Sequence, residues 1–438
     1  MYIAMIVVFV LGYLAIALEH PLKIDKAASA LVTGVVCWAL YAAMEHFNVE
    51  HGYEHHLLEH LSEIASILFF LMGAMTIVET VDAHEGFAVI TDRITTTKKI
   101  KLLWIIAILT FFFSAVLDNL TTSIVMVSLL RKLIKDKETR WMFAGIVVVA
   151  ANAGGAWSPI GDVTTTMLWI GGQITASAII VNIFISSLVC LLVPMIVLSF
   201  TMKGTVERPE KVTGIHTHEV QVNDRERKII FFLGVAGLLF VPLFKTVTHL
   251  PPFMGMMLSL GVLWVVTERL HHAKEYHEKQ QLLVISVLRK IDTASVLFFL
   301  GILLAVASLQ SAGQLGQLAN TLDNTIGTSE ASGVYIVSMV IGLLSAIVDN
   351  VPLVAAAMGM YDIGGTGFFV TDGLFWEFLA YCAGTGGSAL IIGSAAGVAV
   401  MGIEKIDFIW YMKRISLLAI LGYLAGAGWY ILETTLLR

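Results

Sequence analysis

Residues 114–120 read SAVLDNL, and residues 345–351 read SAIVDNV. Both heptapeptides place an Asp-Asn pair, Asp118-Asn119 or Asp349-Asn350, inside a long apolar stretch. A carboxylate at bilayer depth costs on the order of a few kcal/mol, so each aspartate is a functional-site hypothesis. Finding the same costly pair twice predicts a duplicated transporter with half of its binding site in each copy.

The composition indicates an all-α polytopic membrane protein. Of the 438 residues, 57% are hydrophobic and 14% are charged, whereas soluble proteins have about 25% charged residues. The net charge of −6 does not indicate nucleic acid as a partner, and the expected surroundings are the lipid bilayer. The three cysteines are too far apart in sequence for a metal-ligand or disulfide pattern, and we expect no cofactor.

Several apolar segments have the length of a membrane span. They are 2–18, 27–44, 61–80, 141–172, 177–200, 229–247, 252–267, 292–311, 374–400 and 406–432. We interpret 2–18 as an uncleaved first span, because it lacks a basic n-region and a small-residue cleavage site. Two further segments, about 101–134 and about 332–360, are interrupted by the Asp-Asn pairs. Each is either a kinked span or a re-entrant hairpin with Asp-Asn at its tip.

The charges around the two interrupted segments favour re-entrant hairpins. The first segment has Lys and Arg on both flanks, at 93–101 and 131–140, so both of its ends should be cytoplasmic. The second is flanked by the predicted loops 313–330 and 361–373, which contain no Lys or Arg, so both of its ends should be external. The two hairpins would enter from opposite faces and point at each other.

Matching landmarks indicate inverted structural repeats. Residues 65–71 (ASILFFL) match 294–300 (ASVLFFL), and these segments would cross the membrane in opposite directions. The expected organisation is given by residue ranges: N-terminal spans at 1–60, a first repeat at 61–200, a cytoplasmic linker at 201–228, spans and a cytoplasmic loop opening the second repeat at 229–291, and the rest of that repeat at 292–438.

Glycine-rich sequence follows each hairpin. Gly154-Gly155 with Gly161 in the first copy corresponds to Gly386-Gly387 with Gly393 in the second. These glycines predict two unwound, discontinuous transmembrane helices. Unwound backbone at membrane depth is tolerated only where it is buried or lines a cavity, and its free carbonyl groups are hard oxygen ligands for a small cation.

The polar residues of these motifs form the expected site. Asp118, Asp162 and Asp349 would carry the exchange, because protons and Na⁺ can compete for the same carboxylate oxygens. The motifs contain no Lys or Arg, which favours a cation over an anion. We expect this cluster to bind Na⁺ and no transition metal. The expected Na⁺ ligands are Asp118, Asn119, Thr121, Thr122, Asn152, Ser158, Asp162, Thr164, Thr165, Asp349, Asn350, Ser388 and Ser394.

The same residues also have structural interpretations. Asp118 and Asp349 would cap the hairpin tips, and Asp162 would cap a helix that begins at Val163. Hydroxyl groups often pack spans together. Two groups of histidines are predicted to lie in solvated loops rather than to bind metal or to sense pH. They are His46, His51, His55, His56 and His60 on the external side and His216, His218, His271, His272 and His277 on the cytoplasmic side.

Both hairpin motifs and both Gly-Gly segments resemble the ion transporter superfamily of secondary carriers. Within it, residues 117–122 (LDNLTT) and 152–166 (NAGGAWSPIGDVTTT) are similar to the NhaD-type Na⁺/H⁺ antiporters. Sodium–dicarboxylate relatives carry Ser-Asn-Thr at the hairpin tips, where this chain has Asp118 and Asp349. The resemblance implies a scaffold domain and a transport domain that move against each other, and a homodimer.

The leading hypothesis is a secondary antiporter of the cytoplasmic membrane that exchanges Na⁺, with Li⁺ as a second candidate cargo, for H⁺ by alternating access. The alternative is a Na⁺-coupled anion carrier or an arsenite-type exporter of the same superfamily. A remote enzymatic alternative is an intramembrane aspartyl protease, which also uses two buried aspartates. Here Pro159 stands where that class has the first glycine of Gly-x-Gly-Asp, and no Tyr precedes Asp118 or Asp349.

Overall fold

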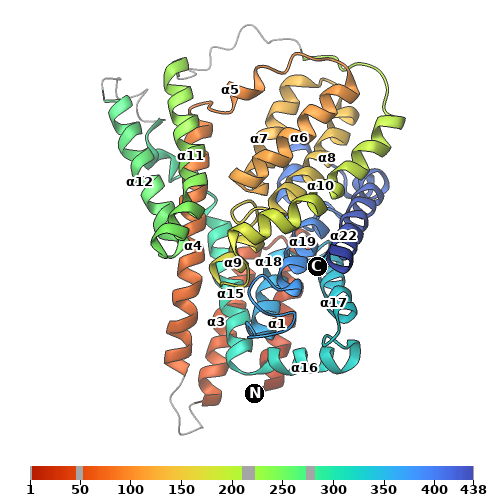
Figure 1. Cartoon of the computed structure of the whole chain (residues 1–438). Coiled ribbons are helices and arrows are strands. Elements are labelled where there is room, and N and C mark those ends of the chain that lie inside the picture. Colours follow the sequence, from red (N-terminus) through yellow and green to blue (C-terminus); the bar gives the residue numbers. More distant parts are fainter. Residues whose placement is uncertain (1, 46–52, 210–221, 273–281, 438) are drawn as a thin grey trace.

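The computed structural model describes residues 2–45, 53–209, 222–272 and 282–437, and in them the chain is helical without a named strand (Figure 1). The all-helical prediction is confirmed. The helices are α1 Tyr2–Ala17, α2 Glu19–Leu22, α3 Lys26–Glu45, α4 Tyr53–Ala83, α5 Ala88–Thr91, α6 Lys99–Leu117, α7 Asn119–Leu133, α8 Lys137–Ala156, α9 Val163–Ile170, α10 Ala176–Thr201, α11 Asp224–Thr248, α12 Pro252–Leu270, α14 Val284–Val287, α15 Thr293–Ser311, α16 Gln314–Ile326, α17 Ala331–Leu344, α18 Asn350–Met360, α19 Leu374–Gly386, α20 Ala395–Glu404, α21 Phe408–Tyr411, the π-helical turn η1 Met412–Ser416, and α22 Leu417–Leu437.

Eight helical segments in the described residues are long and apolar enough to cross a membrane. They are Lys26–Met44, Tyr53–Ala83, Lys99–Leu117, Ala176–Thr201, Asp224–Thr248, Pro252–Leu270, Thr293–Ser311 and Phe408–Leu436. Figure 1 shows α5 near one end of the molecule, and α16 near the opposite end together with the N-terminus. Seven of the eight segments correspond to predicted spans, and Lys99–Leu117 is the first arm of the interrupted segment 101–134. The predicted span 2–18 forms the shorter apolar helix Tyr2–Ala17. The helices support a multi-pass membrane protein.

Four interruptions divide helices at the predicted motifs. Asp118 alone separates α6 from α7, and residues 345–349 separate α17 from α18. Residues 157–162 separate α8 from α9, and residues 387–394 separate α19 from α20. Each interruption leaves a helix N-terminus whose first amide groups need hydrogen-bond acceptors. Side chains at the start of α7, α9, α18 and α20 provide them.

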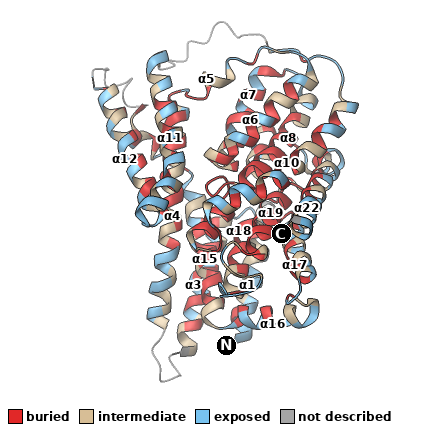
Figure 2. Cartoon of the chain, in the orientation of Figure 1, coloured by how far each residue is buried: buried red, intermediate tan, exposed pale blue. Residues whose placement is uncertain are grey.

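The most enclosed helices are α8 and α19, which contact each other. Every residue from Phe143 to Ala156 and from Phe375 to Gly386 is buried, and Figure 2 shows buried residues concentrated in this part of the molecule. Helices pack closely in a membrane when small residues line their contacts. The glycine and alanine residues of both segments therefore suit the centre of the protein.

The two halves of the chain make matching backbone contacts. A Cβ atom added at Gly154 would lie 2.1 Å from the carbonyl oxygen of Phe111, and one at Gly386 would lie 2.0 Å from that of Gly342. Only glycine allows α8 to approach α6, and α19 to approach α17, so closely. Ser114 on α6 also donates to the carbonyl of Ala151 at 2.5 Å. These contacts place the end of α6 beside the broken end of α8.

Ser345 makes the corresponding contact in the second half. Its hydroxyl donates to the carbonyl oxygen of Ala383 on α19 at 3.0 Å. The end of α17 is thereby held beside α19, as the end of α6 is held beside α8. Each Asp-Asn turn is positioned next to an interrupted helix by one serine and one glycine.

Two loop predictions are wrong. Residues 53–60 form the first turns of α4, so His55, His56 and His60 are helical. Residues 314–326 form α16 rather than a loop. Leu315 and Ala319 are buried one turn apart on α16 and its other residues are largely polar, so the segment is an amphipathic helix without the continuous apolar run of a span. His46, His51, His216, His218 and His277 lie outside the described residues.

His271 is buried, contrary to its predicted place in a solvated loop. It follows α12, and its Nε2 atom lies 2.8 Å from Nε2 of His84, which follows α4 and is also buried. The pairing arises because α4 and α12 pack against each other and end at the same level. The partner residue is 187 positions away in sequence, so no local pattern indicates it.

Candidate functional site

Asp118 forms the turn between α6 and α7. Its backbone φ of +86° is one that L-residues rarely adopt, and such strain of about 1–3 kcal/mol persists where the surroundings impose it. The carboxylate accepts hydrogen bonds from the amide and the hydroxyl of Thr121, both at 2.8 Å. The structural interpretation as a cap therefore holds for Asp118, and Thr121 donates both of these hydrogen bonds.

Asp162 is the carboxylate that receives hydrogen bonds from both halves of the sequence. It caps α9 and is 2% exposed. Oδ1 accepts from the amide of Thr164 at 2.8 Å and from its hydroxyl at 2.5 Å. Oδ2 accepts from Nδ2 of Asn119 at 2.5 Å, and Asn350 of the second half has its Nδ2 atom 3.5 Å from Oδ1. Amide and hydroxyl groups thus orient a buried carboxylate.

Asn152 connects this group to the second glycine-rich segment. Its Oδ1 accepts from Asn119 at 3.1 Å. Its Nδ2 donates to the hydroxyl oxygens of Ser388 and Ser394, each at 2.9 Å. All four side chains are buried. When every buried polar group of a network has a hydrogen-bond partner, the network makes the surrounding site rigid.

Asp349 has a cationic partner that the sequence motifs do not contain. It caps α18 by accepting from the amide of Val351 at 3.2 Å, and its Oδ2 atom lies 3.2 Å from Nζ of Lys26. Lys26 begins α3, 323 positions earlier in the sequence. The motifs themselves lack Lys and Arg, but the fold brings one lysine to the second Asp-Asn pair.

Three predicted ligands do not point their hydroxyl groups at the carboxylates. Ser158 donates to the carbonyl of Ala115 at 2.5 Å. Thr165 donates to the carbonyl of Asp162 at 3.0 Å. The hydroxyl of Thr122 is buried and has no hydrogen-bond partner within the described part of the chain. The fold gives Ser158 and Thr165 backbone-bonding roles, and their role as ligands stays a prediction.

The three aspartates do not share one point in space. Across residues 2–45, 53–209, 222–272 and 282–437, no group of three His, Cys, Asp or Glu side chains is placed to hold a metal ion. A Na⁺ ion at Asp162 would therefore take one carboxylate together with amide, hydroxyl or carbonyl oxygens, which are suitable hard ligands.

Known proteins are similar in sequence to this chain over nearly its whole length. The Citrate transporter family model matches residues 3–376. Sodium/proton antiporter 1 of Arabidopsis thaliana is 46% identical over 437 residues, which cover 98% of this chain and 72% of the relative. The Na(+)/H(+) antiporters NhaD of Alkalimonas amylolytica and Vibrio cholerae serotype O1 are each 30% identical, over 96% and 98% of this chain and 88% and 91% of the relatives. The chain belongs to the NhaD-type antiporter family.

Membership of the NhaD-type family makes this chain a multi-pass membrane transporter rather than an enzyme. The resemblance predicted from residues 117–122 and 152–166 is thereby confirmed. The family assignment does not say which residues hold the ions. The hydrogen-bonded group around Asp162 is the arrangement in this structure that fits the predicted site.

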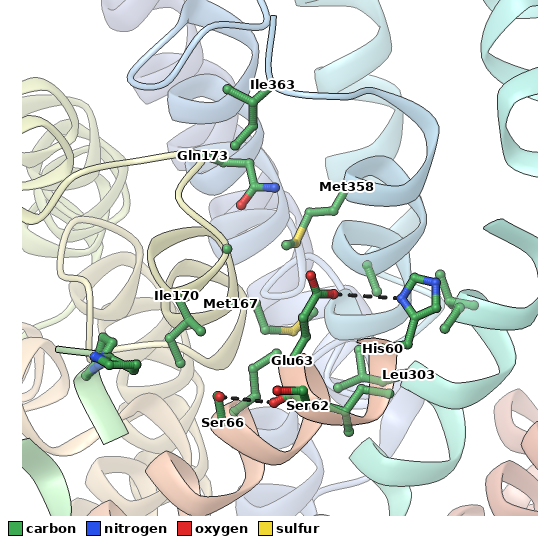
Figure 3. A pocket seen from close by; sticks show the side chains of 18 of the residues that line it. His60, Ser62, Glu63, Ser66, Met167, Ile170, Gln173, Leu303, Met358 and Ile363 are labelled. Carbon is green, nitrogen blue, oxygen red and sulfur yellow. Dashed lines mark hydrogen bonds and ion pairs between the residues drawn. The ribbon is translucent and has the colours of Figure 1, made fainter. Parts of the chain in front are cut away.

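A cavity of about 610 Å³ lies beside this site in the NhaD-type fold. Helices α4, α9, α15 and α18 line much of it, and Figure 3 shows Glu63, Met167 and Met358 around it. Met167 lies on α9, the helix that Asp162 caps. None of the predicted ion ligands lines the cavity itself, so it approaches the site without including it.

Proposed function

We propose that this chain exchanges Na⁺, and Li⁺ as a second cargo, for H⁺ across the cytoplasmic membrane. Na⁺ and protons compete for Asp118, Asp162 and Asp349, and the site faces the two sides of the membrane alternately. The relatives named as Na⁺/H⁺ antiporters support the exchange reaction. The observation that carries the site assignment is Asp162, which is buried without an ion-pair partner among the described residues and receives three side-chain donors.

Competition at Asp162 follows from ordinary carboxylate chemistry. A buried carboxylate is costly unless a cation or a proton neutralises it. At low pH the proton does so, and at higher pH with Na⁺ present the metal ion does so. The carboxylate binds either Na⁺ or a proton, but not both at once. When the site faces the two sides of the membrane alternately, it therefore carries Na⁺ in one direction and H⁺ in the other.

Inverted repeats would supply the two halves of the site. We assign α6–α7 and α17–α18 as re-entrant hairpins, and α8–α9 and α19–α20 as the two discontinuous helices. The matching contacts of Ser114 and Ser345 and of Gly154 and Gly386 support this assignment. In this topology α5 lies at the cytoplasmic end and α16 at the external end, as the basic residues near α5 suggest.

The cavity beside α9 suits an external access path. Glu63 and His60 line it near the start of α4, with Oε2 of Glu63 3.7 Å from Nδ1 of His60. A transport domain with both hairpins would move against α3, α4, α11, α12 and α15, by rocking or by sliding, to close this path and open another. The resemblance adds a homodimer, and the matching sequence landmarks support a first repeat at 61–200 and a second repeat that opens at 229–291 and continues through 292–438.

The test is dequenching of a ΔpH-sensitive dye in everted vesicles after addition of Na⁺ or Li⁺. We expect dequenching with the wild-type chain and its loss with Asp118→Asn and Asp349→Asn at equal membrane expression. Absence of a response to Na⁺ and Li⁺ from pH 7 to 9.5 in folded protein would exclude exchange. A Na⁺-coupled anion carrier would instead accumulate its anion with Na⁺, and an arsenite-type exporter would respond to arsenite alone.

A further inference from the structure

Lys26 and Asp349 form an ion pair that none of the sequence motifs contains. Nζ of Lys26 lies 3.2 Å from Oδ2 of Asp349. The other carboxylate oxygen accepts from the amide of Val351 at 3.2 Å. Both oxygens of Asp349 therefore already have a donor. A Na⁺ ion on Oδ2 would lie close to the ammonium group of Lys26, and the repulsion between the two positive charges opposes their binding together.

The ion pair is partly buried beside an aromatic ring. The side chains are 22% exposed for Lys26 and 13% for Asp349, so water screens the pair only in part. The ammonium also lies 4.4 Å from the centre of the Phe298 ring, a favourable cation–π distance.

The two residues come from parts of the fold that are packed differently. Lys26 is the first residue of α3, which packs mainly against α15 and α1. Asp349 lies in the turn before α18, which contacts α15, α16, α9 and α19. The pair therefore connects α3 directly to the turn that carries the second Asp-Asn motif.

The three aspartates consequently differ in charge balance. Asp349 is neutralised by Lys26, whereas neither Asp118 nor Asp162 has an ion-pair partner in the ranges that the structure describes. An ammonium and a Na⁺ ion carry the same charge, and a single carboxylate oxygen is neutralised by one of them. The two cations therefore compete for Oδ2 of Asp349, because binding both at once would place like charges side by side.

We propose that Lys26 is a tethered competitor of Na⁺ at Asp349. It occupies the carboxylate in the state seen here and raises the Na⁺ concentration needed to load the site. Lys26 keeps its proton throughout and contributes by position, not by proton transfer. This inference rests on the proposed function, because it requires that Na⁺ binds near Asp349.

The test measures Na⁺-dependent thermal stabilisation of the purified protein at one pH, from which a half-saturating Na⁺ concentration is obtained. Lys26→Gln should lower this concentration about tenfold, corresponding to about 1.4 kcal/mol. Lys26→Arg keeps the positive charge and should remain near wild type. Lys26→Met is measured alongside, so that a folding defect of one variant does not remove the test.

Two controls separate competition from a general structural effect. Lys23→Gln removes an exposed lysine three positions away and should leave the Na⁺ response unchanged. In an Asp349→Asn background, Lys26→Gln should have no further effect, because the shared carboxylate is gone. If wild type and the folded Lys26→Gln and Lys26→Met variants had the same half-saturating Na⁺ concentration, this inference would be overturned and the proposed function would be unaffected. Absence of any Na⁺ stabilisation of the wild type would overturn the proposed function and the inference with it.

Discussion

Asn119 donates from Nδ2 to Oδ2 of Asp162 at 2.5 Å, although 43 positions separate the two residues in sequence. The bond connects the first residue of α7 to the cap of α9. It orients a carboxylate that is otherwise held by Thr164 on its other oxygen. The geometry of Asp162 therefore depends on the Asp-Asn motif as well as on its own segment.

Asn119→Ala should weaken Na⁺ binding, because it leaves Oδ2 of Asp162 without its donor. Losing a buried hydrogen-bond partner costs about 1–3 kcal/mol, and we expect the half-saturating Na⁺ concentration in vesicles to rise about tenfold or more. Asn324→Ala on α16 removes an exposed asparagine and serves as the control. An unchanged Na⁺ dependence in well-expressed Asn119→Ala would show that this bond is not needed for binding.

Asp162→Asn should abolish exchange while leaving the fold intact. Asparagine can still cap α9, but it carries no charge for Na⁺ or a proton to neutralise. We expect the exchange rate to fall at least about 100-fold, at the upper end of what losing a supporting ligand costs. Dye dequenching in everted vesicles measures the loss.

The matched control for Asp162→Asn is Asp136→Asn. Asp136 caps α8 through the amide of Thr139 at 2.8 Å and lies outside the site. Hydrogen bonds from Thr139 hold the pKa of Asp136 below its usual value, so it is ionised at neutral pH and the control also removes one charge. Equal activity of the two variants would contradict a special role of Asp162.

The glycines at the helix contacts should not tolerate a methyl group. Gly154→Ala and Gly386→Ala would each force a Cβ atom to about 2 Å from a carbonyl oxygen, and overpacking of this kind destabilises by about 1–3 kcal/mol or more. Gly428→Ala on α22 has no atom within 4 Å of the new Cβ and should be neutral or slightly stabilising. Thermal unfolding in detergent compares the three variants.

Glu404 should be important for stability but not for ion selectivity. Its buried carboxylate lies 2.6 Å from Nε of Arg131 and 2.7 Å from Nε of Arg140, and it joins the end of α20 to α7 and α8. Glu404→Gln removes the negative charge between two arginines and should cost about 1–3 kcal/mol, because Arg131 is half exposed and water partly solvates the freed charge. Glu138→Gln, at an exposed pair 3.8 Å from Arg414, should cost little. A change in the Na⁺:Li⁺ preference of folded Glu404→Gln would contradict this assignment.

The apparent affinity for Na⁺ should depend steeply on pH. If one proton competes with one Na⁺, the half-saturating Na⁺ concentration rises about tenfold for each unit of pH decrease once the site is mainly protonated. It becomes constant at high pH, where the carboxylates are already ionised. Na⁺ titrations of dye dequenching between pH 6.5 and 9.5 test this sign, and a Na⁺ affinity that does not change with pH would argue against competition.

The composition, the lengths of the apolar segments and the positions of the glycines and Asp-Asn pairs were enough to predict the helical class and where its helices break. The interruptions at Asp118, 157–162, 345–349 and 387–394 lie within the predicted motifs. Local sequence carries this information because glycine, proline and capping side chains act on the backbone within a few residues. Residues 53–60 and 314–326 were mistaken for loops, since polar residues on a helix at the membrane boundary look the same in sequence as a solvated turn.

The family, the all-helical class and the set of polar residues at the breaks could be predicted from the amino-acid sequence, because each depends on short stretches of chain. Which of these side chains meet depends on the folded arrangement of the helices. It joined Asn119 to Asp162, Asn152 to Ser388 and Ser394, and Lys26 to Asp349. It also turned the hydroxyl groups of Ser158 and Thr165 toward the backbone. Such pairings depend on the packing of helices far apart in the chain, and local composition contains no information about their relative placement.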